Sequence, residues 1–393
     1  MKRTIKDLKA IKGKVVLLRV DFNVPMDDSC NIMDTTRILK EIPTIKYLSS
    51  QGARIVIISH LGRPNGYELR KSLWPVALFL MKKLPCNVSF CNSVLGDEVK
   101  ARIKALREGN VLLLENIRFF EGETNCDKKF SKELASLGDI FVDDAFGVAH
   151  RESASNYGVA RLLPNAVGFL VEKEVENLSK VIVEPKHPFV ALIGGAKVES
   201  KVKILERFIE KADVILIGGA MAYTFLRAKG ENIGTSLYYP ESEIDALTII
   251  RKAEEAGKKL LLPVDHVVVR ESDKSQKPFI TSEMTGDMVG YDIGPKTIKL
   301  YERELKKAGQ IFWNGPMGLF EKEMFSKGTM AMAHAIASSR AYSVVGGGDT
   351  VSAMNDSGLA DKISFISTGG GATLEFLEKG SLPALDVIQE KIR

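Results

Sequence analysis

Short apolar runs that stop at polar residues alternate with amphipathic stretches in the first half of the chain. Four runs have the length and the Val, Ile and Leu content of buried strands; they cover residues 15–20, 54–59, 111–116 and 139–143. Three stretches between them have the helical period of apolar residues; they cover residues 35–50, 72–84 and 127–137. This alternation predicts a parallel sheet covered by helices, in which ligands bind outside the carboxyl ends of the strands.

In the second half, each apolar run ends in glycines. The runs beginning at Val190, Val214, Ser343 and Ser364 lead into Gly194-Gly195, Gly218-Gly219, Gly346-Gly347-Gly348 and Gly369-Gly370-Gly371. In one parallel sheet these glycines would reach the same edge. Such repetition is more typical of a nucleotide cradle than of unrelated turns.

The length and a change of pattern predict two domains. A chain of 393 residues exceeds the size at which one core keeps growing. A helical stretch at 168–178 is broken by Pro185 and Pro188. We therefore expect an α/β protein with two doubly wound parallel-sheet (Rossmann-like) domains, at residues 1–168 and 189–379. A hinge helix and linker at 169–188 would join them.

Composition and charge narrow the class of ligand. The chain has 55 basic and 50 acidic residues, a net charge of +5, which is too mild for nucleic acid but suits small anions. The N-terminus lacks the apolar core of a signal peptide, and no apolar run is long enough for a membrane span, so we expect a cytoplasmic protein. Spacing of the four cysteines favours reduced thiols.

Polar side chains follow the strands predicted in the first half. They are Asp21, Asn23, His60, Arg63, Arg118 and Arg151, with Arg37 at the start of the first helix. One arginine alone is usually a solvated surface charge, but four in such positions predict a cleft for a multiply anionic molecule. Guanidinium groups bind phosphate and carboxylate oxygens at roughly 1.5–3 kcal/mol per contact. Asp21 and Asn23 would accept hydrogen bonds from a ligand hydroxyl or brace the arginines.

The stretch from Ser343 to Val351 has the features of a phosphate site. Glycine backbone approaches a polyphosphate closely, and the first N–H groups of the following helix point at it. Asp349 suits such a site if Mg²⁺ lies between its carboxylate and the phosphates. On this stretch alone, a glycine turn with Asp349 as an ordinary helix cap is as good an interpretation.

Two further segments carry candidate phosphate contacts. A helix is expected over 198–210, with Lys197 at its start and Lys201 one turn later on the same face. The alternative is an exposed lysine face. The loop after Trp313 offers Asn314 and Glu321 to phosphate and ribose, although a packed tryptophan turn would account for most of that loop.

Common nucleotide-binding motifs are missing from the chain, whereas seven other segments are distinctive. The chain lacks the P-loop, the dinucleotide Gly-x-Gly-x-x-Gly and the protein-kinase motifs. The seven segments begin at Arg19, Ser59, Leu114, Ala145, Gly194, Trp313 and Gly346, and read RVDFNVP, SHLGRP, LENIRF, AFGVAHR, GGAKV, WNGP and GGGDT. Together they resemble the phosphoglycerate kinase family, because they occur in family order and cover nearly the whole chain.

The resemblance implies a monomeric, cytoplasmic glycolytic enzyme that transfers phosphate reversibly between 1,3-bisphosphoglycerate and Mg-ADP. It implies no nucleic-acid or membrane partner, and it implies that residues 380–393 return to the first domain. The implied phosphoglycerate ligands are Asp21, Asn23, Arg37, His60, Arg63, Arg118 and Arg151. The implied nucleotide ligands are Lys197, Lys201, Gly218, Gly219, Gly290, Asn314, Glu321, Gly347, Gly348, Asp349 and Thr350, with Asp349 towards the metal. The implied catalytic groups are Arg37, Lys197, Lys201, Gly370 and Gly371.

The sequence departs from the family pattern near the expected nucleotide site. Ala220 stands where a third glycine is common, Glu199-Ser200 replaces a usual Ser-Asp pair, and Val289 and Tyr291 flank Gly290. Two other classes of protein share part of this pattern. A nicotinamide dehydrogenase would need the dinucleotide motif, and a non-catalytic binding protein would have no use for Lys197, Asp349 and four glycine edges together.

Overall fold

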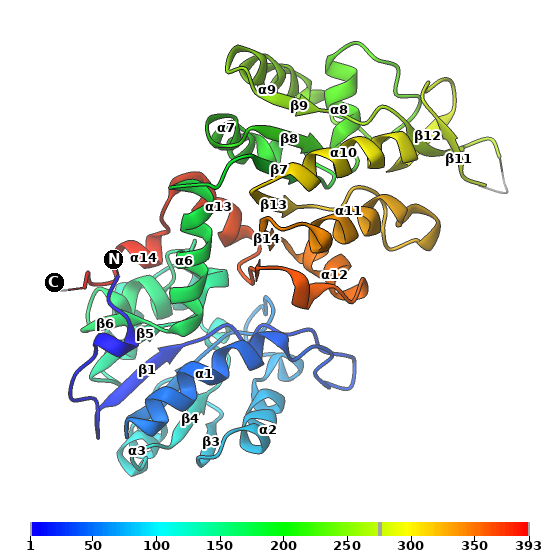
Figure 1. The fold of residues 1–393 in the computed structure, drawn as a ribbon. Helices are drawn as coiled ribbons and strands as arrows, with labels where there is room; N and C mark the ends of the chain where they lie inside the picture. The colour runs from blue at the N-terminus through cyan, green and yellow to red at the C-terminus, as the bar shows by residue number, and fades with distance from the viewer. Residues whose placement is uncertain (1, 274–276, 392–393) are drawn as a thin grey trace. The chain divides into compact units, whose positions relative to one another are not determined.

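The computed structural model describes residues 2–273 and 277–391, and the chain forms two compact units. The first unit comprises Met1–Glu176 and Ser381–Arg393, and the second comprises Asn177–Gly380. The chain passes from the first to the second within helix α6 (Phe169–Ile182), the helix expected near residue 168 (Figure 1). That this segment acts as a hinge stays a prediction.

The first unit is built on a six-stranded parallel sheet of order β3-β4-β2-β1-β5-β6. The strands are β1 (Val15–Arg19), β2 (Arg54–Ile58), β3 (Val88–Cys91), β4 (Val111–Leu114), β5 (Ile140–Asp143) and β6 (Asn165–Val167). All four predicted strands form. The two edge strands escaped prediction because they are short and carry polar residues such as Ser89 and Asn165.

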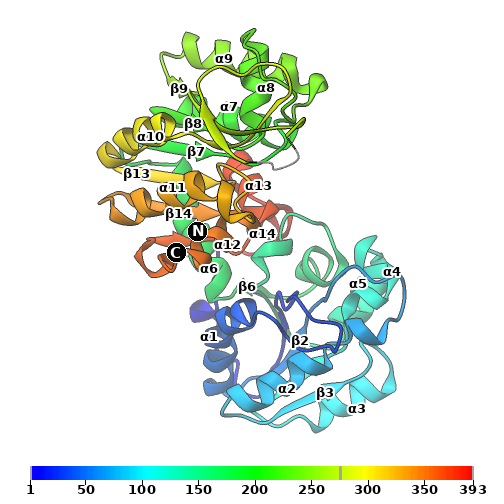
Figure 2. The ribbon, with the colours of Figure 1, turned by 90° about the vertical axis from the view of Figure 1, so that its right-hand side faces the viewer.

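Helices cover this sheet on both faces. They are α1 (Thr36–Ser50), α2 (Trp74–Lys83), α3 (Asp97–Ala105), α4 (Glu121–Thr124) and α5 (Lys128–Ala135). Strand residues Val16 and Leu18 share one buried core with Ile38 and Ile45 of α1 and with Leu80 of α2. Helices α4 and α5 lie away from α1, across the first unit (Figure 2).

The second unit has its own six-stranded parallel sheet, of order β15-β14-β13-β7-β8-β9. Its strands are β7 (Phe189–Ile193), β8 (Val214–Ile217), β9 (Lys259–Leu261), β13 (Gln310–Asn314), β14 (Tyr342–Gly346) and β15 (Phe365–Ile366). The four runs that end in glycine are β7, β8, β14 and β15, so their glycines do reach one sheet edge. The predicted α/β class with two doubly wound parallel sheets is confirmed.

Alternating side chains of the second sheet meet different helices. Its helices are α7 (Val202–Lys211), α8 (Met221–Ala228), α9 (Glu243–Glu255), α10 (Pro295–Lys307), α11 (Lys327–Ser338), α12 (Gly348–Asp356) and α13 (Gly371–Lys379). Leu192 of β7 shares a core with Tyr301 of α10 and Met332 of α11. Phe189 of the same strand packs edge-on against Phe208 of α7, with ring centroids 5.6 Å apart. The sheet is therefore buried on both faces, as its continuous apolar runs indicate.

A small antiparallel sheet in the second unit was not predicted. It consists of β10 (His266–Arg270), β11 (Phe279–Thr281) and β12 (Met288–Ile293), in the order β11-β10-β12. Strand β11 is mostly exposed, and Gly290 interrupts the apolar pattern of β12.

The helix expected over 198–210 is wrong in its first turn. Residues Glu199–Lys201 form a 3₁₀ turn, and α7 begins only at Val202. Lys201 has φ −120°, which interrupts the helix, so Lys197 and Lys201 do not share one helical face. The amphipathic stripe of Ile204, Leu205 and Phe208 starts after this break.

The C-terminal segment is hydrogen-bonded to the first unit. It contains α14 (Pro383–Asp386), which lies beside the N-terminal segment and β6 (Figure 1). Gln389 O accepts from Arg3 N at 2.8 Å, and Ala149 O accepts from Ala384 N at 3.0 Å. These bonds hold the described residues from 381 to 391 against residues that precede α6.

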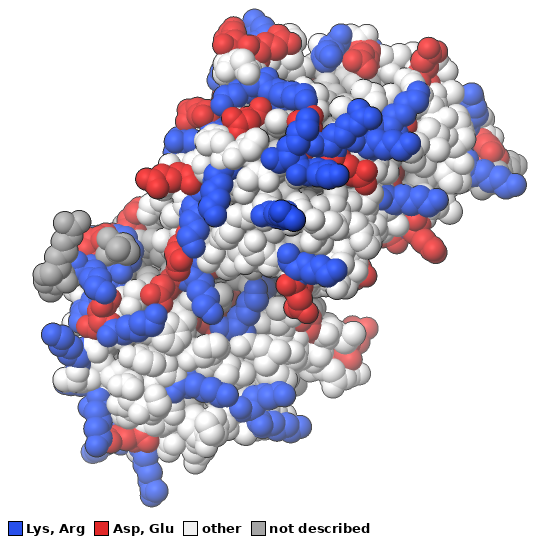
Figure 3. Space-filling view, viewed as in Figure 1, with Lys and Arg blue, Asp and Glu red and all other residues white. Residues whose placement is uncertain are grey.

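Charges of both signs are interspersed on the face in Figure 3. Lysines and arginines gather there over α10, whose exposed basic residues include Lys299, Arg303 and Lys306. Glu302 and Glu304 lie in the same helix, and Glu304 pairs with Lys259 at 2.5 Å. This mixture is typical of a solvated helix face. None of the helices in the described part of the chain is long and apolar enough to cross a membrane.

Tyr301 offers a test of the second core. Its buried hydroxyl donates to Ile217 O at 2.6 Å. In Tyr301→Phe that carbonyl loses a buried donor, and we expect about 1–2 kcal/mol less stability, measured by urea unfolding. Tyr67→Phe is the control because Tyr67 is 65 % exposed. Equal midpoints for Tyr301→Phe and wild type would contradict the assignment.

Candidate active site

A buried arginine that the sequence analysis did not select organises the first unit's polar residues. Arg19, the last residue of β1, is 1 % exposed. Its guanidinium donates to Ser155 Oγ at 2.8 Å, to Val20 O, and to His60 Nδ1 at 3.1 Å. Arginine has no acceptor, so Nδ1 of His60 accepts and the ring proton lies on Nε2, which faces Asp21 Oδ1 at 3.8 Å. The sequence does carry a signal for Arg19, because it is a charged residue inside the apolar run 15–20.

His60 is neutral in this environment. Burial, followed by the charges of Arg19, Arg118, Arg37 and Arg151, holds the pKa of His60 well below its usual range. Burial and the neighbouring Arg19 likewise lower the pKa of Arg118 to about 10, so Arg118 remains charged at neutral pH. Arg37, Arg118, Arg151 and His60 therefore lie in an environment with excess positive charge.

Asp21 and Asn23 connect the loops that carry these side chains. Asp21 Oδ2 accepts from Arg37 Nη1 at 2.6 Å, which is the bracing contact considered from the sequence. Asn23 Oδ1 accepts from Gly62 N at 2.8 Å, and Gly62 O accepts from Arg118 Nη1 at 2.6 Å. The loops after β1, β2 and β4 are thereby held together.

Arg63, Arg118 and Arg151 line one cavity of about 410 Å³ in the first unit. Asn116, which the sequence analysis did not select, holds the backbone of Arg118 and Leu61 beside this cavity. The Asn116 side chain is fully buried, accepts from Leu61 N and Arg118 N, and donates to Leu61 O. We call Arg37, His60, Arg63, Arg118 and Arg151 the arginine cluster.

In the second unit, the glycines that follow β7, β14 and β15 line a cavity of about 430 Å³, which we call the glycine cavity. Its predicted lining residues are Lys197, Lys201, Asn314, Gly347, Gly348, Asp349, Thr350, Gly370 and Gly371. Helices α12 and α13 begin here, at Gly348 and Gly371, so the N–H groups of two first turns lie at the cavity. Gly347 has φ +96°, and a Cβ there would lie 2.5 Å from Asn314 Nδ2, so glycine is required.

Lys201 and Lys197 have different partners in the glycine cavity. The Lys201 ammonium donates to Asn314 Oδ1, and Asn314 Nδ2 donates to Gly346 O at 2.7 Å. Burial lowers the pKa of Lys201 to about 8, and the charge of Asp349 opposes that shift. The Lys197 ammonium instead lies over the Tyr239 ring, 5.6 Å from its centroid.

Asp349 is not the helix cap that the simpler interpretation required. Gly347 occupies the N-cap of α12, and Asp349 is exposed in the first turn. Thr350 Oγ1 accepts from Gly315 N at 2.6 Å, which ties α12 to the loop after β13. The tryptophan of that loop is packed as the alternative interpretation proposed, since Trp313 is fully buried and donates to Gly315 O at 2.8 Å.

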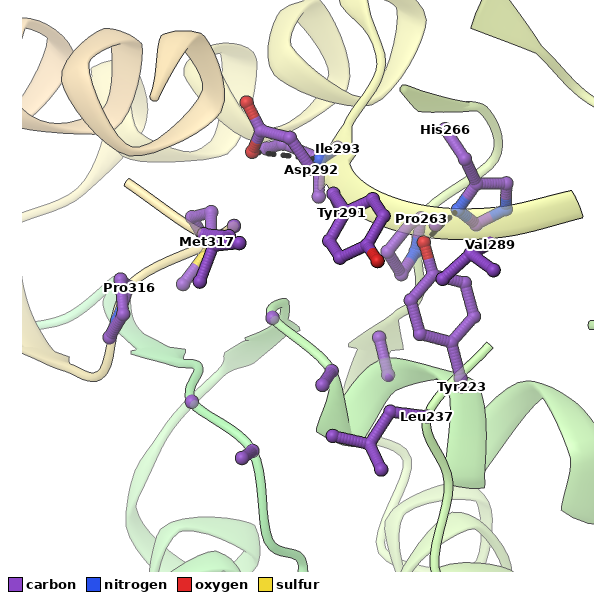
Figure 4. A pocket seen from close by; sticks show the side chains of 18 of the residues that line it. Tyr223, Leu237, Pro263, His266, Val289, Tyr291, Asp292, Ile293, Pro316 and Met317 are labelled. Atoms are coloured by element: carbon purple, nitrogen blue, oxygen red, sulfur yellow. Dashed lines mark hydrogen bonds between the residues drawn. The ribbon is translucent and has the colours of Figure 1, made fainter. Parts of the chain in front are cut away.

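An apolar cavity of about 510 Å³ adjoins the glycine cavity, because both are lined by Gly195, Ala196, Pro316 and Asp349. Tyr223 of α8, Val289 and Tyr291 of β12, and Leu237 and Met317 of two loops face it (Figure 4). Gly219, Ala220, Gly290 and Glu321 also line it. The predicted residue Gly218 lines neither cavity and instead lies against Met317, where a Cβ would approach Sδ to 2.4 Å.

The inner wall of the apolar cavity contains a polar pair that sequence reasoning missed. The Tyr223 hydroxyl and His266 Nδ1 are 3.3 Å apart. Burial lowers the pKa of His266 to about 4, so its imidazole is neutral. Gly290 is essential beside this pair because a Cβ there would lie 1.7 Å from Tyr223 Oη.

The residues around Asp349 suit Mg²⁺ delivered with phosphates. No group of three or more His, Cys, Asp or Glu side chains suited to a metal ion occurs in residues 2–273 and 277–391. A single exposed carboxylate beside a cavity lined by backbone N–H groups fits Mg²⁺, which binds through one or two carboxylates plus substrate phosphates.

Comparisons with known proteins agree with this architecture. A family model described as phosphoglycerate kinase matches residues 5–380. The chain is 47 % identical to the phosphoglycerate kinase of Finegoldia magna, over 99 % of this chain and 100 % of that protein. It is 48 % identical to the phosphoglycerate kinase of Leptospira biflexa, over 100 % of this chain and 99 % of that protein. The solved phosphoglycerate kinase of Coxiella burnetii superposes with a TM-score of 0.90 at 41 % identity, covering 99 % of each chain.

Two parallel-sheet units, one with an arginine cluster and the other with glycine and apolar cavities, define an α/β phosphotransferase. The chain belongs to the phosphoglycerate kinase family. This assignment replaces both alternatives, the nicotinamide dehydrogenase and the non-catalytic binding protein.

The lowered pKa of Lys201 can be tested directly. A pH titration followed by NMR of labelled lysine side chains should give Lys201 a midpoint of about 8. Lys201→Ala identifies the signal. In Asp349→Asn the midpoint should fall further, because the negative charge that favours the ammonium is gone. A midpoint that rises or stays constant in Asp349→Asn would show that the two groups do not interact.

Proposed function

We propose that the chain catalyses the reaction of its family by direct in-line transfer between ligands bound at the two units. The reaction is the reversible transfer of the acyl phosphate of 1,3-bisphosphoglycerate to ADP, which gives ATP and 3-phosphoglycerate. The observation that carries the proposal is the junction of the glycine and apolar cavities, since a nucleoside polyphosphate has one apolar and one anionic end.

The arginine cluster is proposed to hold the phosphoglycerate. A neutral, buried His60 beside charged arginines supports this assignment, because the excess positive charge favours an anion. Arg63, Arg118 and Arg151 would bind anionic oxygens. Asp21 and Asn23 would hold the surrounding loops and accept a ligand hydroxyl.

The nucleotide is proposed to lie along the two cavities of the second unit. Its base and ribose would occupy the apolar cavity, beside Gly219, Gly290 and Glu321. Its phosphates would lie in the glycine cavity, near Lys201, Asn314, Gly347, Gly348 and Thr350. Gly218 would act only indirectly, by making room for Met317.

Phosphoryl transfer needs positioning and charge compensation more than a base, because the donor and acceptor oxygens are already anionic. We assign that compensation to Arg37, Lys197, Lys201 and the amides of Gly370 and Gly371. Mg²⁺ beside Asp349 would neutralise phosphate charge. Closure of the two units would exclude water that hydrolyses an acyl phosphate. We further propose that the enzyme acts as a cytoplasmic monomer.

A coupled assay tests the function. Purified protein with Mg-ATP and 3-phosphoglycerate should support NADH oxidation by glyceraldehyde-phosphate dehydrogenase, with an absolute requirement for both substrates and Mg²⁺. Asp349→Ala should abolish most of this activity. Asp356→Ala is the matched control, an exposed aspartate at the other end of α12. A folded wild-type protein that binds ATP but shows no turnover would refute the assigned substrate.

Lys197 has the sharpest proposed role in the chemical step. Lys197→Ala should lower kcat by about a hundredfold, as expected for the loss of one transition-state donor. Lys203→Ala provides the control, because Lys203 is exposed and pairs with Glu378 at 3.5 Å. Turnover of Lys197→Ala within a factor of two of Lys203→Ala would remove Lys197 from the catalytic groups.

A further inference from the structure

Helix α1 carries a buried carboxyl group that the proposed mechanism does not use. Glu41 follows Arg37 by four residues and therefore lies one turn further along the same side of the helix. Its side chain is fully buried, and Oε1 accepts a hydrogen bond from Asp21 N at 3.1 Å. Glu41 thus contacts the backbone of the residue whose carboxylate holds Arg37.

On its other side, Glu41 meets a second buried carboxyl group, Asp144, which follows β5. Asp144 Oδ1 accepts from Leu170 N at 2.8 Å and from Val171 N at 3.0 Å, both in the first turn of α6. Thr44, also on α1, accepts from Phe169 N at 3.0 Å. The start of α6 is therefore held by two side chains of the first unit.

The two carboxyl groups share one proton. Within the described part of the chain, Glu41 Oε2 and Asp144 Oδ2 are buried and no N–H or O–H donor reaches them. Two adjacent carboxylates cannot both be charged in a dry interior. Burial, with the charges of Asp144 and Asp21, raises the pKa of Glu41 well above its usual range, whereas burial raises that of Asp144 to about 6. Asp144 accepts two backbone N–H groups whereas Glu41 accepts one, so the negative charge is better stabilised on Asp144, and Glu41 is the group that holds the proton and can donate it to Asp144.

We propose that Glu41 is a positioning residue for the arginine cluster. Its protonated carboxyl group joins the Asp21 backbone, and through it the Asp21–Arg37 pair, to Asp144 and the first turn of α6. A side chain able both to accept and to donate is required at this position. The inference rests on the proposed function, because 3-phosphoglycerate is the ligand whose binding it affects.

The test compares Glu41→Leu with Glu41→Gln. Leucine removes both contacts, so Asp21 N loses its acceptor and Asp144 loses its donor. Displacement of Asp21 and Arg37 should then raise the KM for 3-phosphoglycerate about tenfold, as for one weakened charge-assisted contact, with less than about a twofold change for ATP. Glutamine can accept from Asp21 N and donate to Asp144, so Glu41→Gln should restore the wild-type KM.

Ile45→Ala separates positioning from stability. Ile45 is fully buried on the same helix and packs in the hydrophobic core, so this variant should lose stability but retain its KM for 3-phosphoglycerate. Asp144→Asn should raise that KM as well. In the double variant, Asp144→Asn should add little to the increase in KM caused by Glu41→Leu, because both changes break the same connection.

Three results would overturn the inference. The first is a KM for 3-phosphoglycerate of Glu41→Leu within twofold of the KM of Ile45→Ala. The second is a failure of Glu41→Gln to restore the wild-type KM. The third is full additivity of the effects of Glu41→Leu and Asp144→Asn on that KM. If the wild-type protein is active, any of these results refutes the role proposed for Glu41 and leaves the proposed function standing. Wild-type protein that neither turns over nor binds 3-phosphoglycerate by calorimetry refutes the proposed function, and the role of Glu41 with it.

Discussion

The buried guanidinium of Arg19 is the contact on which the first unit's polar site depends. A charge in the interior is tolerated only when its donors are satisfied, and Arg19 meets this demand with Ser155, Val20 and His60, and with Glu123 at 3.9 Å. Ser155, His60 and Glu123 come from three separate segments, so one residue determines where those segments meet. It also fixes the tautomer of His60, and its charge helps to keep that imidazole neutral.

The second unit depends on a different constraint, which is the close approach of glycine backbone to neighbouring side chains. At the loops after β13 and β14, Gly347 approaches Asn314 so closely that a side chain would collide with it. Asn314 can then bridge Lys201 and Gly346. At the far end of the adjoining cavities, Gly290 makes room for Tyr223. Glycine there accommodates neighbouring side chains, whereas at the glycine cavity it also leaves backbone N–H groups open to a ligand.

The sequence alone predicted the parallel sheets and the strand ends well, because buried parallel strands read as continuous apolar runs. It also identified Arg63, Arg118 and Arg151, which follow those strands and line one cavity. It missed the Tyr223–His266 pair, since these residues come from α8 and the weakly patterned β10. The predicted helical face shared by Lys197 and Lys201 is wrong, because the apolar helical period does not reveal the 3₁₀ turn at Glu199–Lys201.

The arginine cluster and the glycine cavity share an electrostatic property, although they are built differently. In both, burial lowers the pKa of a cation, that of Arg118 to about 10 and that of Lys201 to about 8. Such a cation has given up hydration without gaining a full counter-charge from the protein, and an anionic ligand supplies that charge. For Arg118 the charge is permanent at neutral pH, so the arginine cluster attracts anions over a wide pH range. For Lys201 it depends on pH, and a bound phosphate would favour the ammonium form. Anion binding and protonation are therefore linked in the second unit more strongly than in the first.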